Sequence, residues 1–134
     1  MRISQLSRLG GVRTQTIRFY EQQGLLTSPD RQENGYRAYT EKHVRQLSFI
    51  RRCRLLDLSL PEIRQLQKQQ DDPHQSCAAI NTLLEDHIAD VATRIDALQT
   101  LEKQLMSLRS RCNDDRQVER CGVLAEISEM DPAT

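Results

Sequence analysis

The chain has little of what β-rich folds need. Its 134 residues include five glycines, four prolines, three tyrosines, two phenylalanines and no tryptophan, which argues against a sandwich or barrel and favours helices. No run of about 18 apolar residues is present, so we expect no membrane-spanning helix. The opening MRISQLSRLGG lacks the apolar centre of a signal peptide, which favours a cytoplasmic protein. The length indicates one domain, or one small domain with an appendage.

A catalytic arrangement is also missing. The four cysteines form no CxxC pair, and the three histidines are scattered, each more typical of a surface or seam residue than of a catalyst. A reducing cytoplasm disfavours a stable disulfide, so we interpret the cysteines first as buried packing residues or metal ligands. Cys53 lies in an apolar helical stretch and is expected to be buried. We therefore expect no enzyme, although a thiol-based redox or metal-transfer protein using Cys112 and Cys121 is an alternative from another class.

Charge of one sign is unevenly distributed, although the net charge is zero. Residues 1–70 carry 13 lysines and arginines against 6 acids, a balance of +7, and residues 71–134 carry 6 against 13. A basic first half suggests a polyanionic partner for that half alone, with ordinary scatter of surface charge as the alternative.

The basic half begins with the pattern of a helix-turn-helix. ISQLSRLGG predicts a short helix with Ser4 as its N-cap and Gly10–Gly11 as its end. VRTQTIRFYEQQGLL predicts a second helix, capped by Thr14 and ended by Gly24. Two short helices joined by a tight turn that contains glycine are typical of this motif.

A hairpin is expected next. Asn34–Gly35 predicts a type I′ turn, which needs positive φ at both central residues. Arg31, Tyr36 and Arg37 flank the turn, as on a wing whose arginines contact phosphates and whose tyrosines pack against the sugar-phosphate backbone. Beyond it, Thr40 is expected to cap a helix, and SLPE, residues 59–62, predicts a capping box that opens another.

A long helix follows, from about residue 73 to residue 111. Leu84, Val91, Leu98 and Leu105 recur every seven residues, as on a coiled-coil seam, although His87 and Arg94 interrupt the companion series. The sequence therefore predicts a mainly α protein. We expect a winged helix-turn-helix head over residues 1–70, a dimerisation helix over 71–111 and a metal-binding loop and tail over 112–134. The simplest partner for the seam is a second copy in a homodimer.

The same seven-residue repeat also includes two of the cysteines. One heptad before Leu84 is Cys77, and one heptad after Leu105 is Cys112, roughly 50 Å away along a single helix at about 1.5 Å per residue. An antiparallel dimer would place Cys77 of one chain beside Cys112 of the other, with Cys121 folding back to make a three-thiolate site. A parallel dimer would instead pair each cysteine with its own copy. Alternatively, Cys77 and Cys112 only fill seam positions and Cys121 is incidental.

Several motifs are specific to one family. TIRFYEQQGLL, ENGYRAYT and SFIRRCRLLDLSLPEI, with the later CNDDRQVERCGVL, resemble the MerR family of metal-responsive transcription regulators over nearly the full length. The second half is most similar to the cadmium- and lead-sensing branch. In the copper(I) and gold(I) sensors serine takes the position of Cys77, and the zinc sensors carry an additional cysteine and a histidine in the loop. Mercury sensors have a similar three-cysteine arrangement.

The resemblance implies a homodimer that binds double-stranded promoter DNA and acts with RNA polymerase by bending and untwisting an overlong spacer. It implies DNA contacts by Thr14, Arg18, Phe19 and Tyr20 of the second helix, with packing as the alternative for Phe19. It implies further contacts by the wing residues Arg31, Tyr36 and Arg37. Cys77, Cys112 and Cys121 would bind Cd(II) or Pb(II), with Hg(II) and Zn(II) as alternatives.

Overall fold

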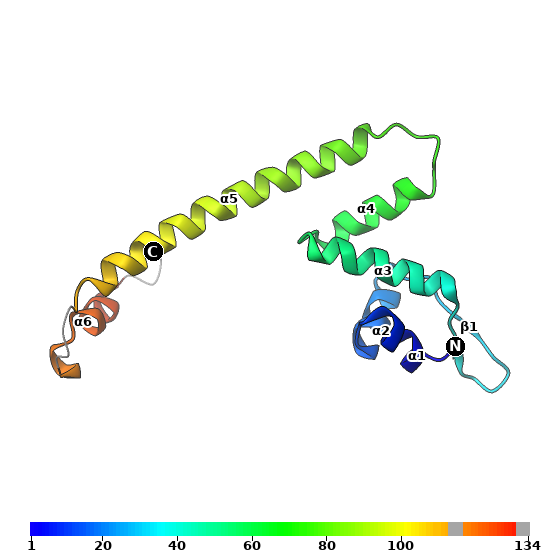
Figure 1. The fold of residues 1–134 in the computed structure, drawn as a ribbon, viewed down its shortest axis with the longest axis horizontal. Helices are drawn as coiled ribbons and strands as arrows, with labels where there is room; N and C mark the ends of the chain where they lie inside the picture. Colours follow the sequence, from blue (N-terminus) through cyan, green and yellow to red (C-terminus); the bar gives the residue numbers. More distant parts are fainter. Residues whose placement is uncertain (113–116, 131–134) are drawn as a thin grey trace. The chain divides into compact units, whose positions relative to one another are not determined.

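The computed structural model describes residues 1–112 and 117–130, which form two compact units, 1–84 and 85–134 (Figure 1). The elements in chain order are α1 (Ile3–Gly10), α2 (Thr14–Gln22), β1 (Asp30–Arg31), β2 (Arg37–Ala38), α3 (Glu41–Leu55), α4 (Leu60–Gln70), α5 (Ala78–Arg109), a 3-10 turn (Val118–Arg120) and α6 (Gly122–Glu129). The prediction of a mainly helical protein is confirmed. None of the helices in the described residues is long and apolar enough to cross a membrane.

The helix-turn-helix starts slightly earlier than the sequence suggested. In α1 the N–H of Leu6 donates to the carbonyl of Arg2 at 3.1 Å, so Arg2 occupies the capping position and the prediction of Ser4 as N-cap is wrong. The end of α1 is confirmed, because Gly11 has a φ of 65°, a left-handed conformation that glycine adopts without strain. A Cβ on Gly10 would collide with Leu47, so these two positions also allow α1 to approach α3.

The second helix also starts earlier than predicted, by one residue. The carbonyl of Arg13 accepts from the N–H of Ile17 at 3.0 Å, which makes Thr14 the first residue of α2 and not its N-cap. Gly24, with a φ of 75°, follows the end of α2 as predicted. The helix-turn-helix is therefore confirmed, with both start positions corrected.

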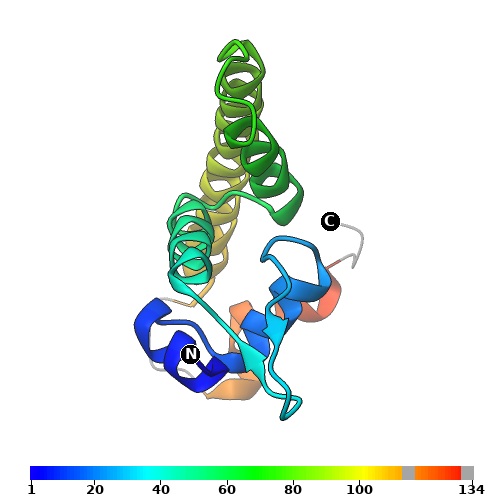
Figure 2. The same ribbon diagram turned by 90° about the vertical axis from the view of Figure 1, so that its right-hand side faces the viewer.

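The wing is a short antiparallel hairpin that projects from the head (Figure 2). Asp30 lies opposite Ala38, and Arg31 lies opposite Arg37. Residues 23–29 connect the end of α2 to the hairpin, and residues 39–40 connect the hairpin to α3.

Its turn differs from the predicted type. Gly35 has a φ of 81°, but the only described non-glycine residue with positive φ is Asp57, so the type I′ turn over Asn34 and Gly35 is wrong. The N–H of Gly35 donates to the carbonyl of Gln32 at 2.9 Å, and the Asn34 side chain accepts from the N–H of Tyr36 at 3.1 Å. The Asn34 side chain thus satisfies the backbone locally, and a longer loop needs only one positive φ.

The capping predictions for α3 and α4 are confirmed. The N–H of Thr40 donates to Nδ1 of His43 at 3.0 Å in the first turn of α3. At α4 the N–H of Ser59 donates to the Glu62 carboxylate at 2.9 Å, and the N–H of Glu62 donates back to the Ser59 hydroxyl at 3.3 Å. Each reciprocal pair satisfies donors that a helix start leaves without partners.

The core lies in the first unit, where α1 packs against both α2 and α3. Fully or almost fully buried apolar residues form it: Leu6, Ile17, Tyr20, Leu25, Leu26, Tyr39, Leu47, Ile50, Cys53, Leu58, Ile63 and Leu83. Burial of each leucine or isoleucine side chain contributes about 1.5–3 kcal/mol. The predicted burial of Cys53 is confirmed at 5% exposure.

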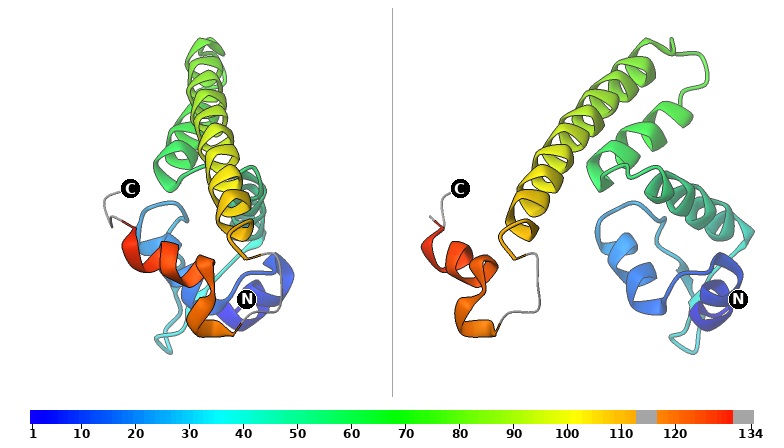
Figure 3. Two further views of the ribbon diagram at one scale, coloured as in Figure 1. Left: turned by 90° about the vertical axis from the view of Figure 1, so that its left-hand side faces the viewer. Right: turned by 60° about the vertical axis from the view of Figure 1, so that its left-hand side comes forward.

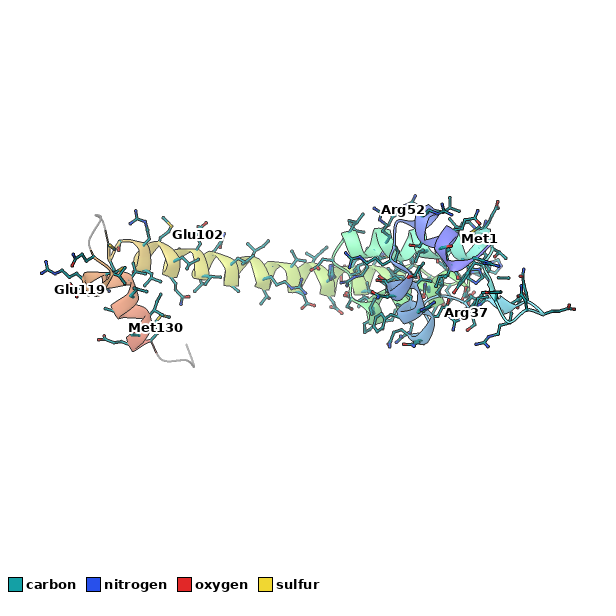
Figure 4. All side chains as sticks on the ribbon, turned by 90° about the horizontal axis from the view of Figure 1, so that it is seen from below. Met1, Arg37, Arg52, Glu102, Glu119 and Met130 are labelled. Atoms are coloured by element: carbon teal, nitrogen blue, oxygen red, sulfur yellow. The ribbon has the colours of Figure 1, made fainter. Side chains whose placement is uncertain are left out.

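The long helix begins later than predicted. α5 starts at Ala78, and the carbonyl of Cys77 accepts from the N–H of Asn81 at 2.9 Å. Cys77 therefore lies at the N-terminal boundary of α5, not inside its first turns, because residues 73–76 form part of the connection from α4. Along the second unit the side chains of α5 project outward with large exposed fractions (Figure 4).

In the described part of the second unit, α6 folds back beside the last turns of α5 (Figure 3). Leu101, Leu105 and Leu108 of α5 and Glu126 and Met130 around α6 line one hollow. Gly122 approaches the backbone so closely that a Cβ there would lie 2.5 Å from the carbonyl oxygen of Arg111. Glycine is thus required where the chain turns back onto the end of α5.

Candidate functional site

The outer face of α2 carries polar and aromatic side chains at helical spacing. Gln15, Arg18, Phe19 and Gln22 are exposed, while Ile17 on the opposite face is fully buried. Phe19 exposes 44% of its surface, so part of its ring is accessible on this face. Gln15 and Gln22 were not among the sequence candidates, because their place on this face depends on which side of α2 the core covers.

Two other α2 candidates are less accessible. Thr14 is half-buried at the start of α2, and Tyr20 exposes 9% of its surface and belongs to the core. The structure therefore shows a packing role for Tyr20, and DNA contacts by Thr14 and Tyr20 stay predictions.

The wing candidates differ in how firmly they are held. Arg31 and Tyr36 are exposed, whereas the Arg37 side chain, 38% exposed, pairs with the carboxylate of Glu21 at 2.9 Å. The Tyr39 hydroxyl donates to the same carboxylate. Glu21 of α2 thus fastens the second strand of the hairpin to the helix.

The surroundings of Tyr39 and Arg37 shift the pKa values of both side chains. Burial raises the pKa of Tyr39, and its hydrogen bond to Glu21 raises the pKa further, so the phenol keeps its proton at neutral pH. The hydrogen bond with Tyr39 and the negative charge of Glu21 raise the pKa of Arg37. Arg37 therefore keeps its positive charge over the physiological range.

A hollow opens beside the wing, lined by Arg2, Ile3, Ser4, Arg18, Gly35, Tyr36 and Arg37. The guanidinium carbon of Arg2 lies 4.3 Å from the centroid of the Tyr36 ring. Arg2 was absent from the sequence candidates because an arginine just before a helix has no specific pattern. Only the fold brings it to the wing, where Arg37 is labelled in Figure 4.

His43 is not the surface or seam residue that the sequence suggested. It is 5% exposed, and its Nε2 lies 3.0 Å from the carbonyl of Thr27. Because Nδ1 accepts from Thr40, Nε2 must carry the proton that reaches Thr27. His43 therefore ties the segment before the wing to the start of α3.

The cysteines fall into two groups. Cys53 is buried, and burial raises the pKa of its thiol. Cys77 is exposed, and Cys112 and Cys121 are half-buried. Because Gly122 meets the backbone of Arg111, their neighbours Cys121 and Cys112 lie at the same end of the second unit.

Arg109 closes that end of α5 by donating through Nη1 to the carbonyl of Cys112 at 2.5 Å. Within the residues that the structure describes, no group of three or more His, Cys, Asp and Glu side chains is placed to hold a metal ion. The segment 113–116 between the two cysteines lies outside the described residues.

Two family models match the chain. "MerR HTH family regulatory protein" matches residues 1–70, and "MerR, DNA binding" matches residues 44–108. Together they span the head and most of α5.

Known proteins match over nearly the whole chain. The transcriptional regulator ZntR homolog of Haemophilus influenzae is 43% identical over 83% of this chain and 82% of its own length. The lead(II) complex of the transcription regulator PbrR691 from Ralstonia metallidurans CH34 has 45% identity and a TM-score of 0.83, covering 95% of this chain and 98% of that one. The mercury(II) complex of MerR from Bacillus megaterium MB1 has 30% identity and a TM-score of 0.71, covering 96% and 100%.

Proposed function

The chain belongs to the MerR family of helix-turn-helix regulatory proteins, and on this premise we propose that it is a metal-responsive transcription regulator. In this proposal it acts as a homodimer on promoter DNA and binds Cd(II) or Pb(II) through three cysteines. The observation that carries the proposal is the likeness to lead-bound PbrR691 over almost the full length of both chains, in a chain with thiols at both ends of α5. Like its relatives, it is a regulator and not an enzyme.

The head is the proposed DNA-binding surface. Arg18 and Phe19 on the exposed face of α2 and Arg31, Tyr36 and Arg37 on the wing are the residues we assign to DNA, with Thr14 and Tyr20 at the edge of this set. Arginines supply phosphate contacts that set affinity and register, and base edges or DNA shape supply specificity.

The exposed apolar stripe of α5 supports the homodimer. Leu84, Ile88, Val91, Ile95 and Leu98 expose between 37% and 65% of their surfaces. A second copy would bury this stripe, as in a coiled coil. An antiparallel arrangement has the advantage that Cys77 of one chain meets Cys112 and Cys121 of the other.

The chemistry of the donors suits a soft metal. Cys77 is accessible, and the close approach of Gly122 to Arg111 places Cys112 and Cys121 at the same end of the second unit, so two donors would come from one loop and the third from the start of a helix. Thiolates select soft or borderline ions over magnesium or calcium. These three cysteines would hold the ion and supply three negative charges to it.

The proposed switch is a two-state dimer. Metal binding to a site shared between subunits would favour one arrangement of the two heads over the other, because only that arrangement brings all three thiolates together. The favoured arrangement would bend and untwist the promoter spacer, so that RNA polymerase can use it.

The decisive experiment is transcription from the chain's own promoter across a panel of metals. A reporter should be repressed without metal and induced by Cd(II) or Pb(II), with the triple variant Cys77→Ser, Cys112→Ser, Cys121→Ser as control. Induction that persists in the triple variant would overturn the cysteine assignment.

Mercury(II) is the second candidate, because the mercury-bound MerR also matches over 96% of this chain. The same panel separates the two candidates through the concentration of each metal that gives half-maximal induction. A lower threshold for Hg(II) than for Cd(II) and Pb(II) favours the mercury sensor.

A further inference from the structure

The hollow beside the wing collects three arginines from three separate parts of the head. Arg2 comes from the residue before α1, Arg18 from the exposed face of α2 and Arg37 from the second strand of the hairpin. None of the seven residues that line it is acidic, and Ser4 adds a hydroxyl. Glu21 already offsets the charge of Arg37, so Arg2 and Arg18 leave a net positive charge at the hollow, which attracts an anion.

Two of these arginines are held by other side chains. Arg2 lies over the Tyr36 ring at 4.3 Å, within the range of a cation–π interaction. Arg37 is held by Glu21, which itself accepts from the Tyr39 hydroxyl. Side chains that are already ordered lose less conformational entropy on binding, so both arginines are pre-organised for a ligand.

The chemistry of the hollow matches a phosphate. A guanidinium presents planar, paired donors that fit the oxygens of a phosphate group, and several of them around one site favour an oxyanion over a neutral ligand. The hollow also adjoins the face of α2 and the wing, which already carry the proposed DNA contacts.

We propose that this hollow binds one backbone phosphate of duplex DNA, and that Arg2, oriented by Tyr36, is a DNA contact beside Arg18 and Arg37. The proposal rests on the proposed function, since it requires that the head binds duplex DNA. It adds a contact from outside the helix-turn-helix and the wing, and it gives Tyr36 the role of positioning Arg2.

The test begins with a duplex that the full-length protein selects from a random-sequence pool. Binding of that labelled duplex is then measured by fluorescence anisotropy over a range of salt concentrations, for the unsubstituted chain and for Arg2→Ala. Loss of one phosphate contact should make the slope of log affinity against log salt shallower by about 0.9. The affinity difference between the two proteins should therefore shrink about three- to four-fold between about 50 and about 200 mM salt.

Arg52→Ala is the matched control. Arg52 is exposed on α3, away from the hairpin, and its loss changes the charge of the head by the same amount (Figure 4). We expect its salt slope to stay that of the unsubstituted chain. An equal change in both variants would mean that net charge, and not this hollow, sets the slope.

Arg2→Lys and Tyr36→Leu test the geometry. Lysine keeps the charge but not the planar group, so Arg2→Lys should keep the slope and lose part of the affinity. If Tyr36 positions Arg2, the double variant Arg2→Ala, Tyr36→Leu should lose less affinity than the two single losses combined. Fully additive losses would overturn the positioning role of Tyr36.

The two levels of proposal fail in different ways. If no duplex is selected, the proposed function itself is wrong. If a duplex is selected but Arg2→Ala binds it with the affinity and slope of the unsubstituted chain, the hollow is not a phosphate site and the proposed function stands.

Discussion

The two units of the chain use their apolar side chains in opposite ways. All twelve core residues lie between Leu6 and Leu83, in the first unit. In the described part of the second unit, most of the large apolar side chains of α5 and α6 remain exposed, with Leu98 at 63% and Ile127 at 49%. The head therefore completes its own core, whereas α5 presents an apolar stripe that only another surface can cover.

The contrast shows how the proposed metal sensing and the proposed DNA binding can lie in different units of one small chain. Helices of this length owe most of their stability in proteins to packing of an apolar face, so a helix without such packing depends on a partner. The residues proposed to bind DNA sit on the self-sufficient unit, and two of the three proposed metal ligands, Cys112 and Cys121, sit on the dependent one. A change in the second unit can then alter the response while the head keeps its fold.

The largest effect is expected from Cys77→Ser. It removes one thiolate of three, and the two left on the loop can hold a linear monovalent ion but serve Cd(II) or Pb(II) poorly. Induction by cadmium and lead should be lost, while DNA affinity measured by anisotropy should equal that of the unsubstituted chain. Retained induction contradicts a role for Cys77 as a ligand.

Mixing variants tests whether the site is shared between chains. In a heterodimer of Cys77→Ser with Cys112→Ser, Cys121→Ser, one site keeps all three cysteines and the other has none. About half of the wild-type cadmium stoichiometry is expected by this count of sites, measured on confirmed heterodimers. No recovery of binding would mean that the ligands come from a single chain.

Truncating a core side chain should destabilise the head more than truncating a side chain of the exposed stripe on α5. Ile50→Ala removes a fully buried side chain and should lower the free energy of unfolding by about 2–5 kcal/mol. Leu98→Ala, in the exposed stripe, should leave the melting of the head nearly unchanged but weaken dimerisation, as measured by analytical ultracentrifugation. A dimer unaffected by Leu98→Ala would move the interface away from this stripe.

A smaller effect distinguishes Ser59, whose predicted role as an N-cap is confirmed, from Ser4, whose predicted role as an N-cap is wrong. Ser59→Ala removes the side chain that accepts from the N–H of Glu62, and should cost about 1 kcal/mol in urea denaturation. Ser4→Ala is the matched control, because Ser4 lies inside α1 and caps nothing there. Equal losses for both variants would contradict the start of α1 at Ile3.

The smallest effect concerns alkaline pH. The pKa of Tyr39 is raised above its ordinary 10.0, so the unfolded chain loses this proton first. Its contribution to stability is complete below about pH 10 and is lost as the pH rises towards the pKa in the folded state. The melting temperatures of the wild type and Tyr39→Phe should therefore converge above about pH 10, with Tyr36→Phe as control. A constant difference would show that Tyr39 ionises alike in both states.

The sequence was sufficient for elements that local chemistry specifies. Ser59 and Glu62 satisfy each other across one turn, Gly11 and Gly24 take positive φ where helices end, and the seven-residue repeat marks α5. It was insufficient where the local sequence allowed two structures equally well, such as two alternative N-caps for the same helix. Ser4 and Thr14 are good caps in isolation, yet Arg2 and Arg13 precede the helices, whose residues Leu6 and Ile17 are fully buried in the core.

The sequence by itself determined the winged helix-turn-helix, the long helix and the candidate metal ligands, because periodicity, turn chemistry and cysteine spacing are all local. Only the tertiary structure decided which face of α2 is exposed, that Tyr20 and His43 are buried, and that Glu21 holds Arg37. It also brought Arg2 to Tyr36, across 34 residues of sequence. Such contacts join residues far apart in the chain, and they depend on how helices pack, which no short stretch of sequence specifies.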